Sequence, residues 1–174
     1  MTMEKKLGVY VCSGCGIGEA LDVEALLKVA SSEYKVPVCR THSFLCGAEG
    51  VGLIQADLAG EGVNAVVIAA CSPRVNYSVF RFDHAFVERV NLREQGIWCH
   101  PANDEDTQML AEDALRMGIV RAQQASLPEP FQGENYSKKI LVVGGGLAGL
   151  TAAALLAERG DRLASQRVQA CMLL

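Results

Sequence analysis

Long apolar runs and clusters of positive charge are both missing from this sequence of 174 residues. No segment approaches the roughly 18 uninterrupted apolar residues of a membrane-spanning helix, and the first residues lack the apolar core of a secretory leader. The 16 lysines and arginines are scattered and the net charge is −4, whereas binding nucleic acid requires clustered positive charge. We therefore expect a cytoplasmic protein that neither inserts into a membrane nor binds nucleic acid.

Cysteine, in contrast, is plentiful, with seven residues. A cytoplasmic protein does not need a framework of disulfides, because that compartment keeps thiols reduced. Cysteines in such a protein more often bind metal or carry out redox chemistry. The hydrophobic half of the residues is enough to fill a sizeable core around them.

Short apolar stretches alternate with helical patterns over residues 1–126. Strands are predicted at 6–11, 36–39, 64–70 and 86–92, and the third reads as a strand buried on both faces of a parallel sheet. A long helix follows "PAND", with Asn103 or Asp104 as its N-cap and with Leu110, Ala114 and Met117 along one face. This order predicts a Rossmann-like α/β domain with a mostly parallel sheet.

The pattern breaks after this domain. Residues 127–138 contain two prolines, a glycine and several charges and are predicted to form a linker. Residues 139–174 begin with a strand and the sequence "GGGLAG", which places Gly144, Gly146 and Gly149 in the G-x-G-x-x-G spacing of a dinucleotide-binding turn. No convincing strand follows Gly160, so we expect a truncated start of a dinucleotide-binding domain.

The first three predicted strands deliver cysteines to one edge of the sheet. Two follow the first strand, one ends the second, one lies in the next loop, and one ends the third: Cys12, Cys15, Cys39, Cys46 and Cys71. The carboxyl ends of parallel strands share an edge, and ligands of open α/β sheets bind there. Cys99 precedes the long helix, and its role is left open.

Several chemistries suit these thiols. Four of them could hold an iron–sulfur cluster or zinc, although neither the bacterial ferredoxin run nor paired C-x-x-C zinc motifs are present. The pair Cys12 and Cys15 alone could form a thioredoxin-like dithiol, and a single cysteine could simply fill the core. Five cationic residues near these loops are either solvated or offset the charge of a cluster: Arg40, His42, Arg74, Arg93 and His100.

Six segments together carry a family resemblance: "GVYVCSGCGIGEALDVEAL", "FLCGAEG", "VVIAACSPR", "VERVNLREQ", "NDEDTQMLAEDALRMGIVRA" and "ILVVGGGLAGLTAA". With them the chain resembles the N-terminal part of the A subunits of heterodisulfide reductases and their relatives, including flavin subunits of quinone-interacting membrane-bound oxidoreductase complexes. The similarity runs from about residue 5 to residue 160.

The resemblance implies an electron-transfer subunit of a multisubunit oxidoreductase complex of anaerobes, which relays or bifurcates electrons. It implies a 4Fe-4S cluster on Cys12, Cys15, Cys46 and Cys71, and FAD, in the full-length protein, at the three glycines. Other subunits would be its partners and would account for any association with a membrane, and a homodimer is left open. A docking domain without catalysis, stabilised by zinc or by packing, is the alternative to this function, beside the dithiol module.

Overall fold

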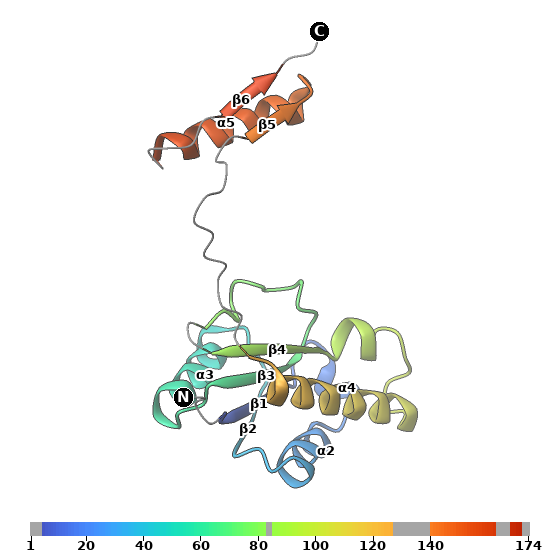
Figure 1. Ribbon diagram of the computed structural model, residues 1–174. Helices are drawn as coiled ribbons and strands as arrows, with labels where there is room; N and C mark the ends of the chain where they lie inside the picture. The colour runs from blue at the N-terminus through green and yellow to red at the C-terminus, as the bar shows by residue number, and fades with distance from the viewer. Residues whose placement is uncertain (1–4, 83–84, 127–139, 163–167, 172–174) are drawn as a thin grey trace. The chain divides into compact units, whose positions relative to one another are not determined.

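The computed structural model describes residues 5–82, 85–126, 140–162 and 168–171 (Figure 1). The chain divides into two compact units, Met1–Pro128 and Glu129–Leu174. The predicted linker at 127–138 lies outside the described residues. The limits of the two domains expected from the sequence therefore remain a prediction. Among the described residues, no helix is long and apolar enough to cross a membrane.

The first unit is built on a sheet of four parallel strands in the order β2-β1-β3-β4. These strands are β1 (Leu7–Cys12), β2 (Val38–His42), β3 (Ala65–Ala70) and β4 (Phe86–Asn91). Every residue of the two central strands, β1 and β3, is buried, as continuous apolar runs predict for a parallel sheet covered on both faces. The predicted fold class, a Rossmann-like α/β domain with a parallel sheet, is confirmed.

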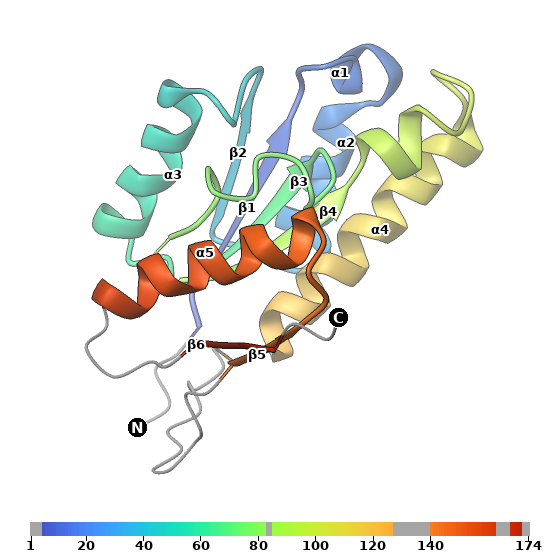
Figure 2. The ribbon, with the colours of Figure 1, turned by 90° about the horizontal axis from the view of Figure 1, so that it is seen from above.

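Helices cover both faces of this sheet (Figure 2). Between β1 and β2 lie α1 (Ile17–Ala20), α2 (Val23–Lys28) and the π-helical turn η1 (Val29–Glu33); α3 (Ala48–Gly60) leads to β3; η2 (Arg93–Ile97) and α4 (Glu105–Gln124) follow β4. Helix α4 packs on β3 and β4 and also contacts η1, whereas α3 lies across the sheet from α2 and α4. The crossovers from β1 to β2 and from β2 to β3 run in opposite directions, so right-handed connections put their helices on opposite faces.

Helix α4 begins as the sequence predicts and turns a different face to the sheet. The Asp104 side chain accepts hydrogen bonds from the backbone N–H groups of Asp106 and Thr107, which makes it the N-cap. The buried face consists of smaller and branched residues: Thr107, Ala111, Leu115, Gly118, Ile119 and Ala122. Leu110 and Met117, which mark the predicted apolar face, are exposed.

The described residues of the second unit form one β-α-β element. It consists of β5 (Ile140–Val143), α5 (Leu147–Arg162) and β6 (Val168–Cys171), and the two strands pair in parallel. The expectation that no strand follows Gly160 is therefore wrong. The four residues of β6 are too short a run to stand out in the sequence, and they form a strand because β5 supplies hydrogen-bonding partners along its whole length.

Candidate functional site

The loop after β1 is a tight turn that presents a cysteine at each end. Cys12 is the last residue of β1 and is buried, while Cys15 is exposed. The turn is closed by hydrogen bonds from the N–H of Ile17 to the Gly14 carbonyl (3.1 Å) and from the N–H of Gly18 to the Ser13 carbonyl (3.0 Å). Cys15 has a φ of 53°, in the left-handed region that non-glycine residues seldom adopt. Such strained residues gather at functional sites, because the surrounding structure must hold them there.

The loop after β2 lies directly against this turn. A side chain on Gly14 would overlap the Ser43 carbonyl oxygen, so only glycine allows the two loops to approach this closely. The His42 carbonyl also accepts a hydrogen bond from the Ser13 N–H (3.1 Å). Cys46 comes four residues after His42 and just before α3, where it is half-buried.

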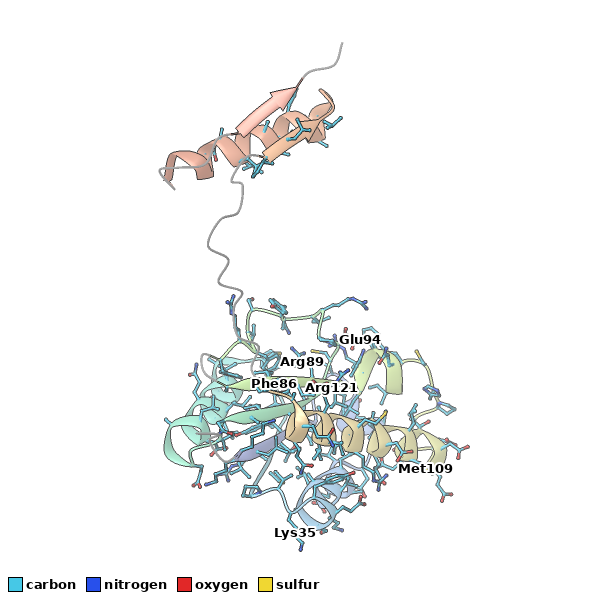
Figure 3. All side chains as sticks on the ribbon, viewed as in Figure 1. Lys35, Phe86, Arg89, Glu94, Met109 and Arg121 are labelled. Carbon is cyan, nitrogen blue, oxygen red and sulfur yellow. The ribbon has the colours of Figure 1, made fainter. Side chains whose placement is uncertain are left out.

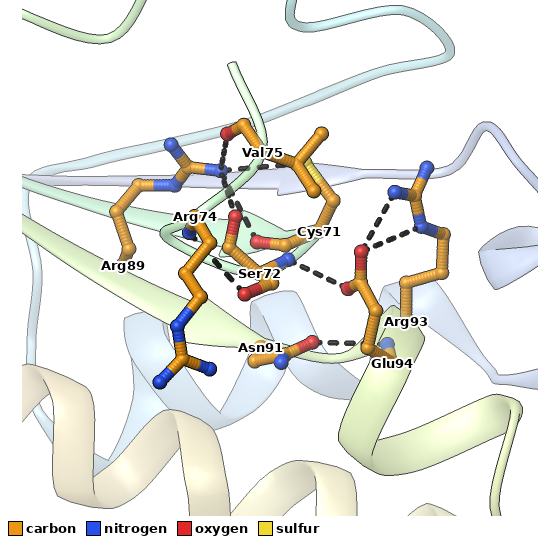
Figure 4. A network of polar contacts seen from close by, with 8 residues as sticks. All are labelled: Cys71, Ser72, Arg74, Val75, Arg89, Asn91, Arg93 and Glu94. Carbon is orange, nitrogen blue, oxygen red and sulfur yellow. Dashed lines mark hydrogen bonds and ion pairs between the residues drawn. The ribbon is translucent and has the colours of Figure 1, made fainter. Parts of the chain in front are cut away.

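The loop after β3 is tied down from β4 and η2 (Figure 4). Cys71 directly follows β3 and is buried. The next N–H group, that of Ser72, donates to the Glu94 carboxylate (2.6 Å), and this carboxylate also pairs with Arg93 (2.7 Å). From β4, Arg89 donates to the carbonyl oxygen of Cys71 (3.1 Å) and to its sulfur (3.3 Å).

These three loops enclose one cavity of about 290 Å³. Its lining contains four cysteines, together with apolar and a few polar side chains: Cys12, Cys15, Cys46, Cys71, Ile17, Phe44, Leu45, Phe80, Asn76 and Arg93. The cavity lies at the carboxyl ends of β1 and β3, where the order of the strands reverses, which is the usual ligand position in an open α/β sheet. Two wider hollows, of about 620 and 430 Å³, contain no cysteine in their linings.

The cavity is low in polarity around the thiols. Burial raises the pKa of the Cys46 thiol, and the neighbouring Cys12 raises it further. Asn76, which also lines the cavity, adopts a left-handed backbone like that of Cys15, with a φ of 52°.

Among the described residues, no group of three or more His, Cys, Asp or Glu side chains is placed to hold a single metal ion. Four cysteines nevertheless share the lining of one cavity.

Two further cysteines of the first unit do not line this cavity. Cys39 is the second residue of β2, beside Val9 of β1, and its thiol donates to the Val36 carbonyl (3.6 Å). The expectation that Cys39 ends this strand is wrong, because β2 begins at Val38 and runs on to His42. Cys99 is exposed and its thiol donates to the Glu94 carbonyl (3.0 Å). Burial raises the pKa of Cys39 as well.

Of the cationic residues near these loops, the structure brings only Arg93 into the cavity lining. Its guanidinium stacks over the Trp98 ring, 4.9 Å from the centroid, and its main partner is Glu94. Arg40 instead forms an ion pair with Asp57 of α3 (3.1 Å). Arg89, which contacts Cys71 from β4, was not foreseen, since only the pairing of β3 with β4 brings it to that loop.

The three glycines of the predicted dinucleotide-binding turn, Gly144, Gly146 and Gly149, differ in their surroundings. Gly144 has a φ of 107°, which permits the sharp turn after β5. A side chain on Gly149 would overlap the Gly144 carbonyl, so this glycine allows α5 to pack against the turn. Gly146 has no neighbour within 4 Å of the position of a Cβ, so the space beside its backbone is open to a ligand.

The chain is similar along most of its length to several proteins named as heterodisulfide reductase subunits. It is 38% identical over 170 residues to the A subunit of the H(2):CoB-CoM heterodisulfide,ferredoxin reductase of Methanothermobacter marburgensis, a match that covers 91% of this chain and 25% of that protein. It is 37% identical to the A subunit of the ferredoxin:CoB-CoM heterodisulfide reductase of Methanosarcina mazei, over 89% of this chain and 20% of that protein. It is 32% identical to the second iron-sulfur A subunit of the CoB–CoM heterodisulfide reductase of Methanopyrus kandleri, over 90% of this chain and 25% of that protein.

No family model matches the sequence. The chain spans a fifth to a quarter of the length of these relatives. The match extends over about nine tenths of the chain, so it includes most of the first unit.

Proposed function

Because this chain is homologous to a part of the heterodisulfide reductase A subunits, we propose that its first unit carries a 4Fe-4S cluster that relays electrons. Cys12, Cys15, Cys46 and Cys71 are the proposed ligands. In the longer protein to which such a unit belongs, the cluster would pass electrons to or from a flavin. A cluster beside a flavin is compatible with the relay of electrons along one path and with the bifurcation of electrons between two paths.

One observation carries the proposal: four thiols from three separate loops line a single cavity at the strand-order reversal of the sheet. Core filling by free cysteines does not require them to meet around a space. Thiolate sulfur is the usual ligand of iron–sulfur clusters, and four ligands suffice for a 4Fe-4S cluster. The name of the Methanopyrus kandleri relative, which describes an iron-sulfur protein, supports the same assignment.

The alternatives use fewer of these features. A structural zinc ion requires four sulfurs at about 2.3 Å from one point, whereas the four thiols here surround a cavity of about 290 Å³. A dithiol enzyme requires only Cys12 and Cys15 and leaves Cys46 and Cys71 without a role. A docking domain without a cofactor gives no reason for the left-handed backbone of Cys15.

The second unit supports a further part of the proposal, the binding of FAD. The N-terminal N–H groups of α5 and the open backbone at Gly146 would hold a pyrophosphate, and FAD would supply hydride and one-electron chemistry when bound. The sequence contains no acid after Asp161 to bind a ribose, so β6 does not end in the residue that such folds use. We propose FAD for the longer protein, with this unit as its pyrophosphate turn.

The proposed partners follow from the relatives. Their names describe subunits of CoB-CoM heterodisulfide reductases, and two of those names include ferredoxin. We propose that this chain acts within a comparable complex and exchanges single electrons with neighbouring subunits.

The test is the metal and sulfide content of the full chain, produced and purified without oxygen. We expect about four irons and four sulfides per chain, a broad visible absorption that bleaches with dithionite, and no zinc. Replacing Cys12 or Cys71 with serine should remove the cluster. Replacing Cys39 or Cys99 with serine provides matched controls, because neither residue lines the cavity, and both variants should keep it.

Zinc in stoichiometric amount would support the docking domain and contradict the cluster. A folded chain without metal, in which Cys12 and Cys15 form a reversible disulfide, would favour the dithiol. Loss of the cluster in the Cys39→Ser variant would contradict the proposed ligand set, although iron and sulfide in the unaltered chain would still establish that a cluster binds.

A further inference from the structure

Arg89 lies on β4 (Figure 3) and contacts Cys71 across the pairing of β3 with β4 (Figure 4). It does not itself line the cysteine cavity. A single nitrogen, Nη2, contacts three backbone carbonyls and one sulfur. These are the oxygens of Cys71 (3.1 Å), Ser72 (3.2 Å) and Val75 (3.5 Å) and the sulfur of Cys71 (3.3 Å). The guanidinium therefore joins the turn after β3 to the strand beside it.

This arrangement is costly for the fold. The Arg89 side chain is half-buried, so its charge is partly withdrawn from water. Among the described residues, its Nε is buried without a hydrogen-bond partner. The Phe80 ring, whose centroid is 4.3 Å away, covers the guanidinium on one side. A half-buried charge with one buried, unsatisfied donor calls for an explanation other than stability, since an apolar side chain of the same size is often as stable.

Arg89 and Arg93 differ in the partners of their guanidinium groups. The charge of Arg93 is offset by the Glu94 carboxylate at 2.7 Å. The guanidinium of Arg89 instead donates to carbonyl oxygens and to the Cys71 sulfur. Arg89 is thus hydrogen-bonded to the sulfur of Cys71, whereas Arg93 is held mainly by Glu94 and also interacts with Cys15.

We propose that Arg89 is the positioning residue of the cluster ligand Cys71 and that its hydrogen bond to the sulfur raises the reduction potential of the cluster. The inference rests on the proposed function. Reduction adds one electron, from a one-electron donor protein, and no proton, so the site gains one negative charge. A fixed positive charge and a hydrogen bond at a ligand sulfur stabilise the reduced form, and hydrogen bonds to the sulfurs are among the factors that set such potentials.

The experiment compares three variants of the full chain, prepared without oxygen. Arg89→Met removes the charge and the donors and keeps much of the length of the side chain. Arg89→Lys keeps the charge and offers three donors to the same carbonyls. Arg121→Gln is the matched control: Arg121 lies on α4, is largely exposed, and pairs with Glu88 of β4 (3.1 Å), whereas Arg89 contacts Cys71.

For each variant, iron and sulfide are counted, folding is followed by circular dichroism, and the midpoint potential is measured by a mediated redox titration followed spectroscopically. We expect Arg89→Met to keep its fold and lower the equilibrium constant for reduction at least tenfold, which is 59 mV for a one-electron couple. Arg89→Lys should recover most of this change. Arg121→Gln should have the potential of the unaltered chain.

Other outcomes also decide the matter. A folded Arg89→Met variant that loses its cluster, while Arg89→Lys keeps it, supports the positioning role. Equal potentials in Arg89→Met and Arg121→Gln overturn it while the proposed function stands. An unaltered chain without iron and sulfide overturns the proposed function, and this inference with it.

A fourth variant covers the case in which Arg89→Met does not fold. Arg89→Gln removes the charge and keeps two amide donors for the same carbonyls, so it retains more of the structural role of the side chain. An equilibrium constant for reduction at least tenfold lower than that of the unaltered chain supports the proposal. An unchanged potential in Arg89→Gln overturns it and leaves Arg89 a purely structural residue.

Discussion

Gly14 and Ser43 lie so close together that a side chain on Gly14 would overlap the Ser43 carbonyl oxygen. This contact joins the turn between Cys12 and Cys15 to the loop that leads to Cys46, so it fixes the relative position of three proposed ligands. We predict that Gly14→Ala pushes the two loops apart, lowers the free energy of unfolding by about 1–3 kcal/mol and weakens cluster binding about 10–100-fold. Iron retention during chelator challenge and denaturant unfolding are the two measurements.

A second glycine provides the control for this variant. Gly52 lies in α3 and has no neighbour within 4 Å of the position of a Cβ. Gly52→Ala should raise the free energy of unfolding by about 0.5–1 kcal/mol, because glycine is a poor helix former, and should leave iron retention unchanged. If Gly14→Ala behaved like Gly52→Ala, the close contact of the two loops would have no part in holding the cluster.

A buried polar pair inside the first unit leads to a prediction about stability. The Tyr10 hydroxyl donates to Oδ2 of Asp57 (3.0 Å), and the same carboxylate receives two hydrogen bonds from Arg40. Tyr10 and Asp57 are both buried. Tyr10→Phe should therefore cost about 1.5–3 kcal/mol of unfolding free energy, the usual value for a hydrogen bond to a charged group. Tyr77→Phe, on an exposed tyrosine, should change it by less than about 0.5 kcal/mol.

The same tyrosine predicts a dependence on pH. Burial, followed by the charge and the hydrogen bond of Asp57, raises the pKa of Tyr10 well above its ordinary value of 10.0. Below pH 10 the hydroxyl keeps its proton in both states, so its stabilising effect is complete. Above pH 10 the unfolded chain releases this proton while the folded chain holds it, so stability falls by about 1.4 kcal/mol per pH unit.

Denaturant unfolding of the unaltered chain and of Tyr10→Phe, at about pH 8 and about pH 11, isolates this effect, because all other tyrosines and lysines titrate in both proteins. The difference in stability between the two proteins should shrink or reverse at the higher pH. A constant difference across this range would mean that Tyr10 loses its proton as easily in the folded chain as in the unfolded one.

Local sequence patterns predicted the parallel sheet, since β1 and β3 are continuous apolar runs and need no knowledge of their neighbours. Local patterns predicted less well those features that depend on residues far away in the sequence, such as which face of a helix is buried. Helix α4 carries two apolar stripes, and the one with alanine and glycine faces the sheet because β4 lies too close for larger side chains: a Cβ on Gly118 would overlap Val90. Strand β6 exists through its pairing with β5.

The residues of the candidate site were likewise predicted only in part. The rule that parallel strands end at one edge was enough to predict that Cys12, Cys15, Cys46 and Cys71 meet, and the cavity brings them together. It was not enough for Cys39, whose place depends on the residue at which β2 begins. Arg89 gave no signal either, because a charged residue in the middle of an ordinary strand contacts a cysteine only through strand pairing.

The glycines of the second unit offer a test of their separate roles. Gly149→Ala should displace α5 from the turn, because the new methyl group would overlap the Gly144 carbonyl, and residues 140–171 should become more sensitive to limited proteolysis. Gly146→Ala should leave proteolysis unchanged, since nothing lies within 4 Å of the added carbon. Equal sensitivity of both variants would contradict the close packing of α5 against this turn.

The left-handed backbone of Cys15 leads to the last prediction, in which a glycine variant loses the cluster without losing stability. In the chain without a cluster, a left-handed φ costs an ordinary residue about 1–2 kcal/mol, and a β-branched residue tolerates it least. Cys15→Gly should thus be at least as stable as the unaltered apo chain, whereas Cys15→Val should be about 1–2 kcal/mol less stable, as measured by denaturant unfolding without metal. Neither variant should take up a cluster on reconstitution with iron and sulfide. A valine variant as stable as the glycine variant would mean that the turn relaxes freely, and the strain would then say nothing about why a cysteine stands there.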